Sequence, residues 1–143
     1  DFKLILIGLP RNAYYYNLRR RKVELDRQYG EKKIEIYADL DREQTKKYIY
    51  SSKIYLMTST WEGFPISLIE AMASGAAYVS TDVGIVKYLE GGYVVDSKKK
   101  MIAALEKMIN GEWKELSRIA RQYANKNMKR STQIKKLEEV MKL

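Results

Sequence analysis

Short apolar runs alternate along this chain with longer polar or amphipathic segments, and this alternation limits the folds that the chain can adopt. The runs are rich in Ile, Leu, Val or Tyr and are bounded by Gly, Pro, Asp or Ser. Such bounded runs are typical of strands buried in a parallel sheet. We therefore predict strands at residues 2–7, 33–38, 54–57, 77–80 and 93–95.

The segments between the runs carry the start and stop signals of helices. Gly30 is placed to end the first helix, and Asp39 or Asp41 is placed to cap the second. Pro65 is expected to open the third helix, because proline is favoured at the first helical position. We predict helices at residues 13–29, 41–51, 65–74 and 85–89, from Ser97 to a break at Gly111, and at 112–126 and 131–142.

Strands that alternate with helices indicate an α/β fold, here a doubly wound, Rossmann-like parallel sheet. We expect one domain over residues 1–143, in which residues 112–143 form C-terminal helices. Ligands of such sheets bind beyond the carboxyl ends of the strands. The loops expected to converge there contain Gly8-Leu9-Pro10, Ala38-Asp39, residues 58–64 and Asp82-Val83-Gly84.

The composition restricts the chemistry that the chain can perform. It contains no Cys and no His, which excludes disulfides, thiolate metal sites and the usual general base and zinc ligand. The net charge of +9 favours polyanions, anionic lipid headgroups or phosphorylated small molecules as partners, although Lys and Arg are spread along most of the chain. No apolar run is long enough to indicate a membrane span.

Two glutamates, Glu62 and Glu70, flank the start of the third predicted helix and are separated by seven residues. The backbone amides of a helix start can bind a phosphate or diphosphate, and Gly63 has no Cβ to obstruct its approach. The Glu70 carboxylate suits a vicinal diol such as a ribose. Glu62 is placed for a second polyhydroxyl group beyond the phosphates. These residues predict a site that binds sugar, diphosphate and ribose in that order.

The same segment resembles the donor-binding domain of GT-B glycosyltransferases, in the large retaining family called glycosyl transferases group 1. The resemblance covers about residues 2–110, where Leu4–Gly8 looks like the strand before the nucleotide-side glycine loop. Its central motif comprises Ser59, Glu62-Gly63-Phe64, the helix end from Glu70 to Gly75 and the loop Asp82-Val83-Gly84.

This resemblance implies roles for individual residues. Glu62 would be the catalytic residue that contacts the transferred hexose, and Glu70 would bind the ribose hydroxyls. The donor would be a nucleotide-diphosphate sugar such as a UDP- or GDP-sugar, and neither a bound metal nor another cofactor is expected. The remaining donor contacts are expected from Gly63, Phe64, Ile66, Ser67, Gly8 and Ala38.

The resemblance also implies that parts of the enzyme are missing from this chain. The family's Arg and Lys pair and its N-terminal acceptor-binding domain are absent, Ala38 stands where glycine is usual, and Lys87 lies near a position that is commonly acidic. We therefore expect a fragment that is inactive alone and that belongs to a hexosyltransferase of glycan or lipid-glycan synthesis. Such an enzyme is expected in the cytoplasm, with peripheral contact at the inner face of the membrane.

Plainer interpretations of these residues stay open. Glu62 and Glu70 also fit a charge at a helix start and a solvated side chain on a helix face. Trp61 and Phe64 are expected to anchor the loop rather than to stack on the base. Residues 19–22, with the sequence Arg-Arg-Arg-Lys, fit a solvated helix face, or alternatively a contact with anionic lipid or phosphate.

A second class of function also remains, that of a non-catalytic basic Rossmann-like module that binds nucleic acid or another polyanion. Aromatic residues interleaved with basic ones would support this interpretation. The Lys and Arg residues do not gather on one predicted strand face, so nucleic acid is not the expected partner.

Overall fold

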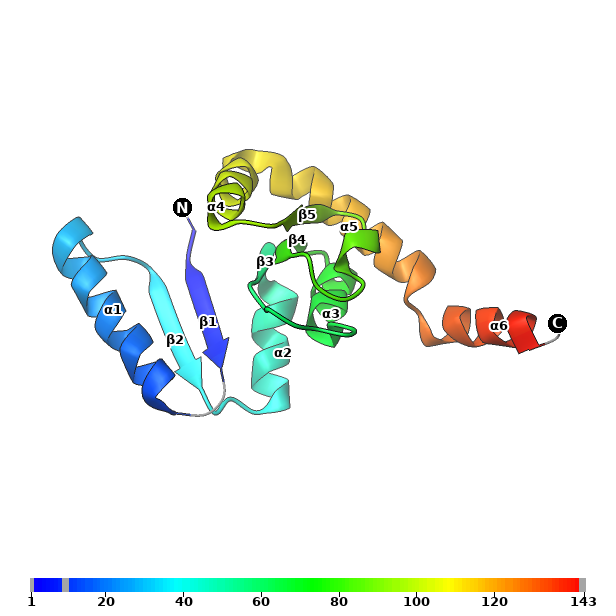
Figure 1. The fold of residues 1–143 in the computed structure, drawn as a ribbon, viewed down its shortest axis with the longest axis horizontal. Coiled ribbons are helices and arrows are strands. Elements are labelled where there is room, and N and C mark those ends of the chain that lie inside the picture. Colours follow the sequence, from blue (N-terminus) through cyan, green and yellow to red (C-terminus); the bar gives the residue numbers. More distant parts are fainter. Residues whose placement is uncertain (1, 9–10, 142–143) are drawn as a thin grey trace. The chain divides into compact units, whose positions relative to one another are not determined.

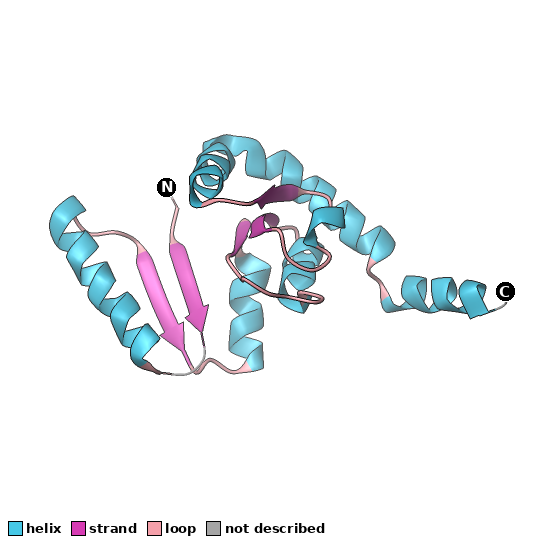
Figure 2. Ribbon diagram, in the orientation of Figure 1, coloured by secondary structure: helices cyan, strands magenta, loops and turns pink. Residues whose placement is uncertain are grey.

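The computed structural model describes residues 2–8 and 11–141 and has an α/β architecture in which helices alternate with parallel strands (Figures 1 and 2). The chain divides into two compact units, Asp1–Tyr48 and Ile49–Leu143. The boundary falls within helix α2 (Arg42–Ser51). The strands pair as two parallel sheets, one in each unit. The expectation of one donor-binding domain over the whole chain stays a prediction.

The first unit contains two parallel strands joined by a long helix. Strand β1 (Leu4–Gly8) pairs with β2 (Ile34–Ala38), and Gly8 lies opposite Ala38 in the register. Helix α1 (Ala13–Tyr29) has the predicted bounds, with Asn12 as its N-cap and Gly30, at φ 75°, as its C-cap. The two candidate residues of this unit are thus neighbours at the carboxyl ends of paired strands.

The three arginines of the basic run in α1 are exposed and Lys22 is half-buried, and the hydrogen bonds of the run lie within the helix. Arg19 donates a hydrogen bond to the hydroxyl of Tyr15 at 3.0 Å, and Arg21 donates one to Glu24 at 3.0 Å. Lys22 forms an ion pair with Asp26 one turn later, and this pair lowers the pKa of that carboxyl. These contacts are those of a solvated helix face.

The second unit is built on strands β3 (Ile54–Met57), β4 (Ala77–Thr81) and β5 (Gly92–Val95), which are parallel and lie in that order. Helix α3 (Ile66–Ser74) connects β3 to β4, and the short helix η1 (Val86–Tyr88) lies between β4 and β5. Beyond β5 the chain forms α4 (Lys98–Lys107), a π-helical segment (Met108–Glu112), α5 (Trp113–Asn127) and α6 (Arg130–Met141).

Strand β4 is the centre of this unit, because helices cover both faces of it. Tyr78 faces a core that includes Leu68 of α3 and Ala120 of α5. Ala77 and Val79 face the opposite core, together with residues of α4 and the π-helical segment. Alternating side chains of one buried strand therefore hold two helical layers, as expected of a doubly wound sheet.

Two glycines at the start of β5 allow this strand to pack closely against α5 and β4. A Cβ on Gly91, whose φ is +93°, would lie 2.3 Å from the backbone nitrogen of Ala120. A Cβ on Gly92 would lie 2.4 Å from the ring of Tyr78. The hydroxyl of Tyr78 donates to the carbonyl of Leu89 at 2.9 Å, and burial raises the pKa of this hydroxyl. No larger residue fits at these two positions without displacing the helix or the ring.

Most element boundaries agree with those predicted from the sequence. Of the two proposed caps of α2, the structure selects Asp41, because Asp41 and Gln44 exchange hydrogen bonds between side chain and backbone amide at 2.7 and 3.1 Å. Gly75 ends α3 in the left-handed region, and Gly111, at φ 126°, interrupts the later helices. The predicted positions Leu9, Pro10 and Lys142 lie outside the described residues.

We expect Gly91→Ala to lower the free energy of unfolding by about 3 kcal/mol, because the new methyl group would meet the backbone of α5. Gly63→Ala is the matched control: no atom lies within 4 Å of the point that a Cβ would occupy there, so the change should stay within about 0.5 kcal/mol. Urea denaturation followed by far-ultraviolet circular dichroism measures both values. Equal losses in the two variants would contradict this account of the packing.

Candidate functional site

The loop that follows β3 is held by side-chain hydrogen bonds. The hydroxyl of Ser59 donates to Oε1 of Glu62 at 3.0 Å, which closes the loop around residues 60 and 61. The hydroxyl of Thr81, the last residue of β4, donates to the carbonyl oxygen of Ser59 at 2.6 Å. The carboxylate of Glu62 therefore has a defined position relative to the ends of β3 and β4.

The loop that follows β4 packs directly against the loop that follows β3. Gly84 adopts φ +53°, and a Cβ at this position would lie 2.3 Å from the carbonyl oxygen of Gly63 and 2.5 Å from that of Glu62. Only glycine permits this contact between two backbones. Within the second unit, the predicted convergence of these loops is confirmed.

Gly63 differs from Gly84 because nothing in the described structure requires a glycine there. Its φ lies outside the left-handed region, and no atom lies within 4 Å of the position that a Cβ would occupy. Neither backbone conformation nor packing explains the residue. The missing side chain leaves open space beside the backbone of the loop.

Helix α3 begins at Ile66, one residue later than predicted, and Pro65 is its N-cap. The carbonyl of Pro65 accepts hydrogen bonds from the amides of Leu68 and Ile69, at 3.1 and 3.2 Å. The amides of Ile66 and Ser67 precede these and belong to the turn that has no intrahelical acceptors. The first turn contains no acidic residue, so the positive end of the helix dipole is not offset within it.

Helix α3 contains two half-buried polar residues of the candidate site, Ser67 and Glu70. The hydroxyl of Tyr55, on β3, donates to Oγ of Ser67 at 2.8 Å. The side chain of Ser67 is thus held by the sheet, and its backbone amide is the group offered at the helix start. Glu70 is half-buried on the next turn, and its Oε2 atom is shielded from solvent.

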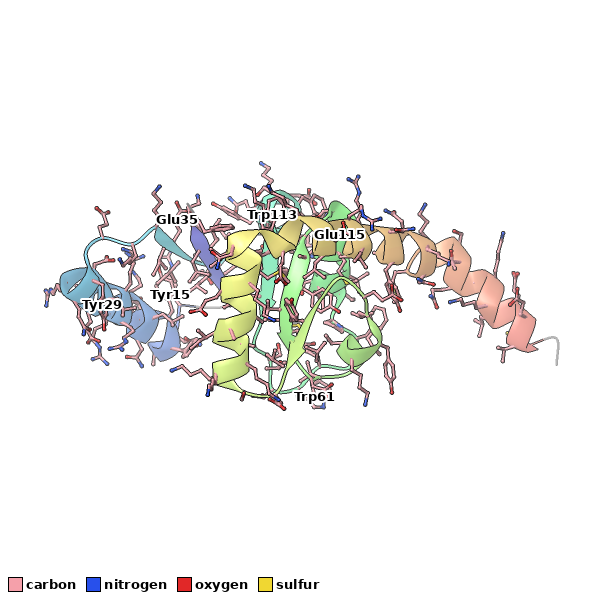
Figure 3. All side chains as sticks on the ribbon, turned by 90° about the horizontal axis from the view of Figure 1, so that it is seen from above. Tyr15, Tyr29, Glu35, Trp61, Trp113 and Glu115 are labelled. Carbon is pink, nitrogen blue, oxygen red and sulfur yellow. The ribbon has the colours of Figure 1, made fainter. Side chains whose placement is uncertain are left out.

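The expectation that Trp61 and Phe64 anchor the loop is wrong. Trp61 is 84% exposed and Phe64 54% exposed, and Ile66 at the start of α3 is 62% exposed. Figure 3 shows Trp61 on the loop side of the unit, away from Trp113 on α5. Hydrogen bonds and the close approach of Gly84 hold the loop instead.

The structure distributes the candidate residues over both units. The second unit brings together Glu62, Gly63, Phe64, Ile66, Ser67 and Glu70 on one loop and one helix. Gly8 and Ala38 are paired in the first unit, where Asp39 follows in a left-handed conformation with φ 59° and forms an ion pair with Arg11. The convergence of all four loops on one cleft stays a prediction.

Two contributors to the site were not identified from the sequence. Thr81 and Tyr55 hold Ser59 and Ser67 through hydrogen bonds that span 22 and 12 residues. The only local signal is that each is a polar group within or at the end of an apolar strand. The bond of Thr81 depends on the register of β3 and β4, and the bond of Tyr55 depends on how α3 packs against β3.

The candidate residues lie outside two grooves of the described structure. Two grooves of about 470 and 500 Å³ lie elsewhere, one between the end of α3 and α5 and the other between α1 and β2, and neither contains a candidate residue. Among the described residues, no group of three or more acidic side chains is arranged to hold a metal ion. No helix within that part of the chain is both long and apolar enough to cross a membrane.

Comparisons with solved structures find the same fold within longer proteins. The sucrose-phosphate synthase of Thermosynechococcus elongatus superposes with a TM-score of 0.68 at 20% identity, over 86% of this chain and 33% of that one. A GtfA/B complex gives 0.65 at 26% identity, over 87% and 26%, and TarM gives 0.63 at 17% identity, over 96% and 35%. The chain thus spans about a third or less of these proteins.

The sequence itself decides the family. A search of curated proteins found no match to the chain. The family model described as glycosyl transferases group 1 matches residues 1–127, which is most of its length. The chain therefore belongs to the glycosyl transferases group 1 family.

Proposed function

We propose that this chain is the nucleotide-sugar donor-binding domain of a retaining glycosyltransferase, which transfers a hexose from a nucleotide-diphosphate sugar to a glycan, lipid or other acceptor. One observation carries the proposal. The Glu62 carboxylate is held by Ser59 beside the free space at Gly63, and the chain leads from there directly into the start of α3.

The diphosphate binds at the start of α3 in this proposal. The amides of Ile66 and Ser67 lie in the first turn, where donors lack intrahelical acceptors and the helix dipole favours negative charge. Gly63 and Phe64 precede them and supply two further amides. The free space at Gly63 lets phosphate oxygens come close to the backbone.

The two glutamates bind the hydroxyl groups at the ends of the donor. Glu62 accepts one hydrogen bond from Ser59, which orients its carboxylate and leaves further lone pairs for hexose hydroxyls. Glu70 lies on the following turn and is assigned to the ribose. Gly8 and Ala38, which are adjacent in their sheet, border the nucleotide and its base.

The remaining parts of the activity are assigned to groups outside this chain. Acceptor binding belongs to the N-terminal domain of the complete enzyme, and the chain alone is inactive. Transfer uses no resident metal or other cofactor, since positioning and hydrogen bonding of the donor supply the catalysis. We place the enzyme in the cytoplasm, with peripheral contact at the inner face of the membrane.

The alternative of a polyanion-binding module has less support. Several basic side chains of the described residues are engaged by acidic ones, which lowers the positive charge that these side chains offer to a polyanion. These ion pairs include Lys3–Glu35, Arg11–Asp39, Arg21–Glu24, Lys22–Asp26, Lys46–Glu43, Lys100–Asp96 and Arg118–Glu115.

We expect Glu70→Gln to weaken binding of the preferred nucleotide sugar by about 10- to 100-fold, the loss typical of hydrogen bonds to a charged group. Calorimetric titration with UDP-, GDP- and ADP-sugars measures the dissociation constant. The control is Glu115→Gln on α5, which removes an exposed glutamate that pairs with Arg118 and should leave binding unchanged.

Binding of no nucleotide sugar to the chain or to the complete enzyme, with salt-sensitive binding of oligonucleotides, would overturn this proposal in favour of the polyanion module. Equal binding by the parent protein and Glu70→Gln would remove Glu70 from the site.

We also expect Gly63→Ala to weaken binding of the nucleoside diphosphate by roughly tenfold, about 1.4 kcal/mol, because a methyl group would occupy the space assigned to the phosphates. The variant should retain the unfolding free energy of the parent protein. Calorimetry with the diphosphate alone, beside urea denaturation, separates the two effects. Unchanged affinity would show that the diphosphate does not approach Gly63.

A further inference from the structure

A polar groove of about 470 Å³ lies between the end of α3 and one face of α5, and we call it the α5 groove. Ser74 and Gly75 contribute one wall, and Lys114, Arg118 and Arg121 are the charged residues of the other. None of the residues that line the groove carries an acidic or an apolar side chain. Because the only charges in the lining are positive, the groove favours an anion as its ligand.

The α5 groove and the candidate donor site lie at opposite ends of α3. The helix begins after the loop that follows β3 and ends before β4 starts at Ala77, so its last residues lie at the amino ends of the strands. Its nine residues span about 13 Å. In Figure 3, Glu115 on α5 and Trp61 on the loop after β3 lie at opposite edges of the unit. The groove is thus a separate site, and the inference below does not depend on donor binding.

The cations of the groove repeat along α5 at spacings that bring like charges together. Arg118 lies four residues after Lys114 and three before Arg121, and like charges at these spacings destabilise a helix. Glu115 offsets Arg118, because it accepts two hydrogen bonds from that guanidinium, at 2.6 and 3.1 Å. Within the described part of the chain, no acidic side chain forms an ion pair with Lys114 or Arg121. An anion in the groove would relieve a repulsion that the protein itself leaves uncompensated.

The wall formed by the end of α3 does not use these charges. Cations often lie near the end of a helix because its last carbonyls lack partners. Here the carbonyls of Ala71 and Met72 accept hydrogen bonds from the amides of Ala76 and Gly75, at 2.9 and 3.0 Å. The carbonyl of Gly75 accepts one from the hydroxyl of Ser117. The helix end contributes about half an elementary negative charge, less than two cations supply, so the groove keeps a net positive charge.

We propose that the α5 groove binds a phosphate group, held by Lys114 and Arg121. A phosphate group carries about one to two negative charges, which matches the charge that these two side chains leave unpaired. The guanidinium of Arg121 can donate two parallel hydrogen bonds to phosphate oxygens, and Lys114 adds a mobile point charge. The phosphate belongs either to a free phosphorylated small molecule or to a phospholipid headgroup, and the experiments below separate these two sources.

Amide-detected two-dimensional NMR of the chain, titrated with sodium phosphate at constant ionic strength, maps the site directly. We expect saturable shifts at the amides of Gly75, Ser117 and Arg121, with a dissociation constant of about 1–10 mM. Lys114→Gln and Arg121→Gln should each weaken binding about threefold to fivefold, as for exposed charge pairs, and the double variant should show no saturation.

The variants allow a matched control. Glutamine at position 121 keeps the side-chain stem through Cδ, the atom that lies beside Gly75, so the fold should be retained. Lys99→Gln makes the same change in net charge at an exposed residue of α4 outside the groove, and it should leave the dissociation constant unchanged. Arg121→Lys keeps the charge without the planar donors and should recover part of the affinity.

Two ligands separate the sources of the phosphate. Flotation compares vesicles of equal parts phosphatidylcholine and phosphatidylglycerol with vesicles of phosphatidylcholine alone. Binding to the anionic vesicles that is lost in the double variant would assign the groove to a lipid headgroup. Shifts with glycerol phosphate, without binding to either vesicle, would assign it to a free phosphate ester.

Three results would overturn the proposal. One is the absence of saturable shifts at the groove with phosphate, or equal affinities of the double variant and Lys99→Gln. Another is tighter binding of a single-stranded oligonucleotide that is lost in the double variant, which would indicate a nucleic-acid surface. The third is loss of the phosphate response at the groove when a nucleotide sugar saturates the chain, since the two sites would then not be separate. If no nucleotide sugar binds, the donor proposal fails, while the phosphate titration is still measured independently.

Discussion

The contact between the loops that follow β3 and β4 is the constraint on which the candidate site depends. It consists of one hydrogen bond, from Thr81 to the carbonyl of Ser59, and one close approach, of Gly84 to the carbonyls of Glu62 and Gly63. The two loops are distant in sequence, and each alone would have many conformations. Joined, they orient the Glu62 carboxylate and set the entry to α3 before any ligand arrives, which lowers the ordering cost of binding.

The stability of this contact depends on how well the strands that carry the two loops are packed. Tyr78 and Val79 lie fully buried on opposite faces of β4, and Gly91 and Gly92 allow the start of β5 to pack closely against α5 and the Tyr78 ring. Thr81 follows directly from this buried segment. The packing that stabilises the unit therefore also fixes the position of the Thr81 hydroxyl, which holds the loop that follows β3.

The sequence predicted what depends on local patterns, and missed what depends on distant partners. Apolar runs and breakers such as Gly75 and Gly111 placed nearly all strands and helices within one or two residues. The Glu62 and Glu70 spacing placed both on one loop and helix. The loop was expected to be anchored by Trp61, because a large apolar side chain usually seeks burial. The actual anchors, Thr81 and Gly84, act through a strand register that no local pattern reveals.

The charge balance at the start of α3 limits how this site can bind a diphosphate. The helix dipole supplies about half an elementary charge, less than a diphosphate carries, and residues 58–66 add a carboxylate but no cation. Neutralisation by this segment alone is therefore incomplete. In the proposed donor site, what this segment contributes to affinity is mainly hydrogen-bond geometry, from the backbone amides to the phosphates and from Glu62 and Glu70 to the sugar hydroxyls. A site of that kind discriminates by shape, because a displaced phosphate or an inverted hydroxyl loses a bond that no general attraction replaces.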